Sequence, residues 1–141
     1  MKTLKTLLGR LFGGPAPAHA QGSEWERLMS EVMSLGEKGQ YDRAVGVAKK
    51  ALDVAEKDVG PNHPDVALSL NNLAELYHAQ GRDAQAEPLY KRSLAIREKA
   101  LGPDHPDVAT SLYDFAKLYR ATGRIEEAEE LKNRARRASG G

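Results

Sequence analysis

Two stretches of this chain decide its fold: GPNHPDVA at residues 60–67 and GPDHPDVA at residues 102–109. They lie 42 residues apart, and the register between them continues downstream without a gap. Residues 60–93 and 102–135 share 19 identities in 34 positions. Identity at this level exceeds what shared helical composition produces, so the chain contains an internal repeat.

A third, more divergent copy lies 42 residues upstream. Gly39, Ala44 and Leu52 match the residues found 42 positions later, Gly81, Ala86 and Leu94. The sequence therefore predicts one repeat domain over residues 23–138, between a leader at 1–22 and a tail at 139–141. Its three repeats are expected at about residues 23–59, 60–101 and 102–137.

Each repeat is expected to form two antiparallel helices. The apolar residues of the second repeat recur at helical spacing on one face, and Gly81-Arg82 interrupts the pattern before a second stripe begins. The first stripe consists of Val66, Leu70, Leu73, Ala74 and Tyr77, and the second begins with Ala86, Leu89, Tyr90 and Leu94. No alternating strand pattern is visible, so we expect an all-α fold.

Helix starts carry recognisable capping residues. Asn62 and Asp104 are N-cap types, and each is followed by a proline that the first helical turn accepts. Ser23 with Glu26 has the spacing of a capping box. These signals predict where the first helix of each repeat begins.

This arrangement of helix, glycine turn and helix resembles the tetratricopeptide repeat. The family's small packing residues fall on Ala74, Ala86, Ala116 and Ala128, and its aromatic position falls on Tyr77 and Tyr119. The 42-residue period and the GP(N/D)HPDVA motif are similar to the kinesin-light-chain-like subclass. The resemblance implies an α-solenoid of three repeats, with six helices in a right-handed superhelix.

The resemblance also implies a concave groove, lined by the first helix of each repeat, that accepts a peptide. Groove positions of the family pattern fall on Glu26, Met29, Met33, Leu68, Asn71, Glu75, His78, Thr110, Tyr113, Lys117 and Arg120. The related clamp for acidic chaperone tails needs Lys, Asn, Asn, Lys and Arg, and only Asn72 fits it. Each groove residue could equally be an ordinary solvated residue of a helix face.

Composition argues against catalysis. The chain has 141 residues, a formal net charge of +1 and no cysteine, which excludes disulfides, thiolate zinc sites and a cysteine nucleophile. His63 with Asp65, and His105 with Asp107, could be metal or acid–base pairs, but we interpret both as helix starts that recur with the repeat. We expect no enzyme activity, no metal and no cofactor.

The predicted function is therefore a non-catalytic adaptor that binds a peptide or protein segment. The alternative is a self-assembly unit that stacks through its terminal repeats, because Trp25, Met29 and Met33 resemble exposed residues of an uncovered first repeat. Weak homo-oligomerisation would follow from it. The C-terminal basic residues could bind nucleic acid, but they are expected to stabilise the last helix terminus instead, so no nucleic-acid partner is predicted.

The leader has three interpretations. It could be a cleaved secretory signal ending at Ala18-His19-Ala20, although Arg10 interrupts its apolar stretch. It could also be a basic amphipathic helix, since Leu4, Leu7, Leu8, Leu11 and Phe12 fall at helical intervals, or a disordered arm. A cytoplasmic location is favoured, with a periplasmic or secreted one if the signal is cleaved; no membrane span is expected.

Overall fold

The computed structural model describes residues 23–139 and consists of helices joined by short turns. Six helices are present there: α2 (Glu24–Glu37), α3 (Tyr41–Val59), α4 (Pro64–Ala79), α5 (Asp83–Leu101), α6 (Pro106–Ala121) and α7 (Ile125–Ala138). No strand occurs between residues 23 and 139. The predicted all-α fold of three helix pairs is confirmed.

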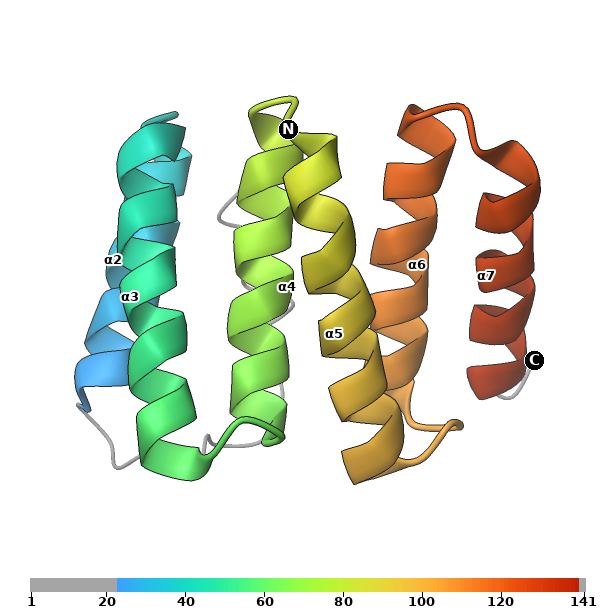
Figure 1. Ribbon diagram of the computed structural model, residues 1–141, viewed down its shortest axis with the longest axis horizontal. Coiled ribbons are helices and arrows are strands. Elements are labelled where there is room, and N and C mark those ends of the chain that lie inside the picture. The colour runs from blue at the N-terminus through green and yellow to red at the C-terminus, as the bar shows by residue number, and fades with distance from the viewer. Residues whose placement is uncertain (1–22, 140–141) are drawn as a thin grey trace.

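The helix pairs follow one another in chain order across the molecule, with α2 behind α3 in this view (Figure 1). Each helix packs against the next, within a pair and between pairs. We call α2, α4 and α6 the A helices and α3, α5 and α7 the B helices. Packing mainly between consecutive helices is typical of a solenoid, in which one repeat contacts only the adjacent repeats.

Histidine, and not the preceding residue, caps the A helices of the second and third repeats. The Nδ1 atoms of His63 and His105 each accept a hydrogen bond at 3.0 Å, from the backbone N–H of Asp65 and Asp107 respectively. The prediction of Asn62 and Asp104 as N-caps is therefore wrong by one residue. A proline occupies the first helical turn directly after each cap, where its missing N–H costs nothing.

Ser23 begins α2 as predicted. Its Oγ accepts a hydrogen bond from the backbone N–H of Glu26 at 3.2 Å. The B helices, by contrast, begin without a side-chain cap and follow a tight glycine turn. Gly81, in the turn between α4 and α5, has φ of 75°, a conformation that L side chains avoid.

Small residues bring the helices close together. Ala74, Ala86 and Ala128 have no exposed surface, and Ala116 is also buried. Leucine, valine and the aromatic residues Tyr77, Tyr90, Phe115 and Tyr119 fill the space around them. The predicted alanine-packed core is confirmed, in two clusters of buried residues, which explains how a chain with 6% aromatic residues forms its core.

The sequence suggested an exposed Trp25, but this residue is buried. Its side chain is 2% exposed, and its indole Nε1 donates a hydrogen bond to Ser69 Oγ on α4 at 2.8 Å. Met29 is likewise buried and approaches the same hydroxyl. The first repeat is therefore joined to the second through these side chains, and the prediction of an exposed Trp25 and Met29 is wrong.

Two ion pairs repeat along the B helices with the 42-residue period. Arg92 of α5 pairs with Glu56 of α3 at 3.1 Å, and Arg134 of α7 pairs with Glu98 of α5 at 2.8 Å. Arg134 thus links α7 to α5, whereas the sequence had suggested only a role at the end of the last helix. These half-exposed pairs add modestly to stability.

The three interpretations of the leader concern residues 1–22, which lie outside the described residues. Among residues 23–139, none of the helices combines the length and apolar character needed to cross a bilayer.

Candidate ligand-binding face

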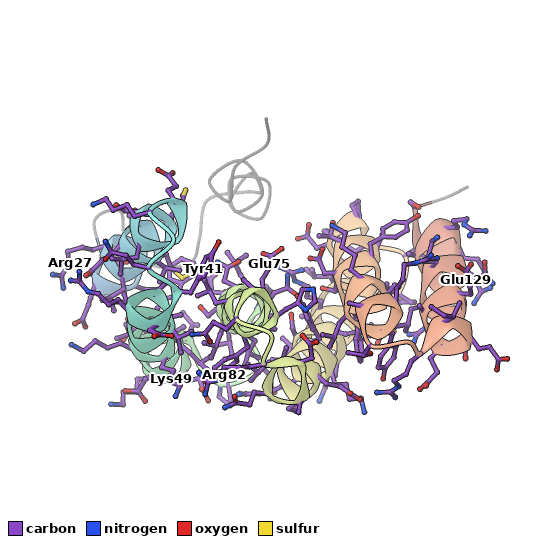
Figure 2. All side chains as sticks on the ribbon, turned by 90° about the horizontal axis from the view of Figure 1, so that it is seen from above. Arg27, Tyr41, Lys49, Glu75, Arg82 and Glu129 are labelled. Carbon is purple, nitrogen blue, oxygen red and sulfur yellow. The ribbon has the colours of Figure 1, made fainter. Side chains whose placement is uncertain are left out.

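The predicted groove residues lie on the A helices. Figure 2 shows Glu75 on one side of the row of helices, with Arg82 and Lys49 on the opposite side. We call the surface on the Glu75 side, formed by α2, α4 and α6, the A-helix face.

The predicted groove residues differ widely in exposure. Thr110, Tyr113, Lys117 and Arg120 of α6 are exposed. The half-buried members are Glu26, Met33, Leu68, Glu75 and His78. Met29 and Asn71 are buried. Tyr113 is the most notable of the set, because it is a large aromatic side chain that stays 38% exposed.

Asn71 joins α4 to α6. Its side chain has no exposed surface, and its Nδ2 donates a hydrogen bond to Asp114 Oδ2 at 2.9 Å. Its Oδ1 is buried without a hydrogen-bond partner in residues 23–139. Native proteins leave few buried polar atoms unsatisfied, so this oxygen calls for an explanation.

Glu75 lies one helical turn after Asn71 on the same face of α4. Its Oε2 is also buried with no hydrogen-bond partner in the described part of the chain. The pKa of Glu75 is raised to about 7, mainly by burial and also by the negative charge of Asp114, while Lys117 and His78 oppose the shift. The carboxyl group of Glu75 therefore changes charge near neutral pH.

Asp114 and Tyr90 complete this environment. Burial raises the pKa of Asp114, and the hydrogen bond from Asn71 partly offsets this. Burial also raises the pKa of Tyr90 on α5, with contributions from the charges of Glu75 and Asp114. We call Asn71, Glu75 and Asp114 the acceptor cluster, because its unsatisfied atoms all accept hydrogen bonds.

Two other groove residues already have charged partners. His78 Nδ1 lies 2.6 Å from Asp83 Oδ1 at the start of α5, and Arg120 pairs with Glu129 of α7 at 2.8 Å. Lys117 has no carboxylate within ion-pair distance among residues 23–139. The basic end of the A-helix face is therefore partly neutralised by the chain itself.

A separate depression of about 570 Å³ lies away from the acceptor cluster, at the turns that end α2 and α4. Its lining residues are Gly39, Gln40, Tyr41, Asp42, Arg43, Gln80 and Arg82. Gln80 donates a hydrogen bond to Asp42 across it, which links the first two repeats. This depression was not predictable from the sequence, because its residues come from two different turns.

The His-Pro-Asp motifs act as helix starts, as we interpreted them. Each histidine uses Nδ1 for its cap, and no group of three metal-ligating side chains gathers within residues 23–139. Sequence reasoning did miss Asp114 as a partner of Asn71. The 42-residue period carried no signal for this contact, because Asp114 occupies the repeat position of Asn72 and not that of Asn71.

Comparison with solved structures agrees with this fold. A chain from Podosopora anserina, described as a kinesin light chain with nearly identical TPR-like repeats, is 28% identical with a TM-score of 0.71, over 80% of this chain and 55% of its own. A point variant of that protein matches equally well, over 83% and 56%. BtubC (BKLC) from P. vanneervenii is 18% identical with a TM-score of 0.75, over 97% and 53%, and supports the fold alone.

The chain thus spans about half the length of these structural relatives. None of the curated proteins matches it. Tetratricopeptide repeats in general bind protein partners and act as non-catalytic scaffolds. The family model described as tetratricopeptide repeat matches residues 32–99 and 65–139, and its two matches together span most of the sequence. The chain belongs to the tetratricopeptide repeat family, with kinesin-light-chain-like repeats.

Proposed function

We propose that this protein is a non-catalytic adaptor whose A-helix face binds a peptide or protein segment, without a cofactor. One observation carries the proposal. The buried positions of α4 and α6 are largely identical, whereas the groove positions that match between them all differ: Leu68/Thr110, Asn71/Tyr113, Glu75/Lys117 and His78/Arg120. A surface that only covers the core has no need of such graded chemistry.

The residue types on this face suit a polypeptide ligand. Met33 and Leu68 offer apolar contacts, Tyr113 is an exposed aromatic residue, and Lys117 is an exposed cation. Aromatic and flexible apolar side chains are common at protein interfaces, where they bury area at low entropic cost. An extended or helical segment lying across α2, α4 and α6 would contact all four.

A peptide array probed with the full chain tests this proposal. Tyr113→Ala and Arg120→Glu change exposed groove positions, and Lys50→Glu on α3 is the matched control at an exposed position of a B helix. We expect the first two variants to lose binding about 10-fold or more for the peptides that the unchanged protein retains, and the control to lose none. Unchanged binding in both groove variants would place the site elsewhere.

The alternative of self-assembly through the terminal repeats loses its main support. It depended on an exposed Trp25, Met29 and Met33, of which Trp25 and Met29 are buried and Met33 is half-buried. Light scattering over a concentration series separates the two functions, because a stacking unit grows in mass with concentration. We expect a constant monomer mass.

A further inference from the structure

The acceptor cluster holds more hydrogen-bond acceptors than donors. Asn71 donates one N–H of its amide to Asp114, while Asn71 Oδ1 and Glu75 Oε2 are buried with no hydrogen-bond partner among residues 23–139. Asn71 is fully buried. Its amide nitrogen is bonded to Asp114, whereas the oxygen of the same amide has no partner among the described residues. Leaving such groups unpaired costs about 1–3 kcal/mol each, more when they are charged. The cluster is therefore energetically incomplete as it stands.

The cations among residues 23–139 do not complete it. Lys117 of α6 and Arg97 of α5 lower the pKa of Asp114, yet neither forms an ion pair with Glu75 or Asp114 among residues 23–139. Arg97 instead donates to Ser111 Oγ at 2.7 Å and to the backbone carbonyl of Asp107. His78 of α4 faces Asp83 of α5. Tyr90 of α5 is an uncharged phenol at neutral pH, and burial raises its pKa further above its ordinary value.

The missing partner is one that donates several hydrogen bonds and carries positive charge. An ammonium group supplies three donors and a guanidinium group five, and neither accepts any. Hydrogen bonds from such groups to carboxylates are the strong, charge-assisted kind. An anionic ligand group would instead meet two carboxylates in a poorly solvated site.

We propose that the acceptor cluster of Asn71, Glu75 and Asp114 binds one lysine or arginine side chain of the polypeptide ligand. This inference rests on the proposed function and adds that the ligand residue recognised by the acceptor cluster carries a positive charge. The cation donates hydrogen bonds to Glu75 Oε2 and Asn71 Oδ1, while the amide nitrogen of Asn71 keeps its hydrogen bond to Asp114. The same acidic pair rejects a ligand with glutamate or aspartate at that place.

The experiment uses pools of synthetic nonapeptides that are randomised except at one position. That position holds arginine, lysine, citrulline or glutamate; citrulline has the shape of arginine without its charge. Binding of each pool to the full chain is measured by fluorescence polarisation at pH 8. We expect the arginine and lysine pools to bind at least about 10-fold more tightly than the citrulline and glutamate pools.

Charge-removing variants place the effect at the cluster. Glu75→Gln and Asp114→Asn are each expected to cut the arginine-over-citrulline preference by about 10-fold, whereas Glu130→Gln, an exposed carboxylate of α7, leaves it unchanged. Circular dichroism verifies that each variant is folded. The preference is also expected to shrink between pH 8 and pH 6, as Glu75 takes up a proton.

The outcomes separate this inference from the proposed function. Pools that bind without any charge preference, or a preference that survives both variants, overturn the inference and leave the adaptor function standing. If no pool binds at all, both proposals are wrong.

A cationic side chain could come from another protein or from Lys2, Lys5 and Arg10 of this chain, which precede the described residues. The full chain carrying Lys2→Glu, Lys5→Glu and Arg10→Glu distinguishes the two sources. Tighter binding of the arginine pool by this variant means that the chain's own segment competes for the cluster. Unchanged binding assigns the cluster to a separate ligand.

Discussion

Helices α4 and α6 are near copies in their interior and different on the A-helix face. The identical buried pairs are Val66/Val108, Ala67/Ala109, Ser69/Ser111, Leu70/Leu112, Ala74/Ala116, Leu76/Leu118 and Tyr77/Tyr119. On the face, asparagine, glutamate and histidine of α4 stand against tyrosine, lysine and arginine of α6. The difference separates residues that build the solenoid from residues to which we assign ligand binding in our proposal.

We expect the largest effect from substitutions at the buried positions that α4 and α6 share. Leu70→Ala and Leu112→Ala each remove a fully buried side chain at the same repeat position. We expect each to lower the free energy of unfolding by about 2–5 kcal/mol, because each leaves a cavity and loses apolar burial. Urea denaturation of the two variants measures this. Costs that differ several-fold between the two sites would break the equivalence of the repeats.

Pro88 is an exception on the B helices. It is exposed in the interior of α5, at the position that holds Glu130 in α7. Proline removes a helical hydrogen bond and crowds the preceding turn, so Pro88→Glu should raise the unfolding free energy by about 1–3 kcal/mol. Thermal denaturation gives the answer, with Glu130→Gln as the matched control. A lower melting temperature for Pro88→Glu would mean that the packing of α5 requires the proline.

The histidine caps of α4 and α6 also occupy the same repeat position, and we expect a smaller effect from their removal. His63→Ala and His105→Ala each remove one side-chain acceptor from a helix N-terminus. By analogy with other N-caps, each should cost about 0.5–2 kcal/mol. Chemical denaturation detects this, and His63→Asn and His105→Asn should restore most of the loss, since asparagine also caps well. Failure of the asparagine variants to do so would argue against a capping role.

The periodic features of the structure were predictable from the sequence because each appears twice. Helix pairs, glycine turns and alanine contacts follow from local spacing, and the 42-residue repeat places them relative to one another. The caps were assigned one residue early because histidine is a less familiar N-cap than Asn62 or Asp104. The recurrence of Arg92 and Arg134 was visible in the sequence, but the sequence did not show that these arginines pair with Glu56 and Glu98.

Features that occur once were not predictable. Trp25 has no aromatic counterpart in the other repeats, so nothing in the period indicated that it would bond to Ser69. The contact between Asn71 and Asp114 likewise joins residues at different positions of adjacent repeats. Its energetics depend on burial and on two neighbouring carboxylates, which only the packed helices bring together.

Glu75 provides the most direct test of the claim that the A-helix face serves a ligand and not the fold. Its folded pKa of about 7 lies above its ordinary value near 4.5. Its contribution to stability is therefore full below pH 4.5 and is lost as the pH rises through 7. The measurement is the unfolding free energy of Glu75→Gln relative to the unchanged chain, by urea denaturation at pH 8 and at pH 5.

We predict that Glu75→Gln is more stable at pH 8, by on the order of 1–3 kcal/mol, and that this advantage shrinks toward pH 5. A variant destabilised at pH 8 as strongly as Leu70→Ala would contradict the account, because Glu75 would then belong to the packing of the solenoid.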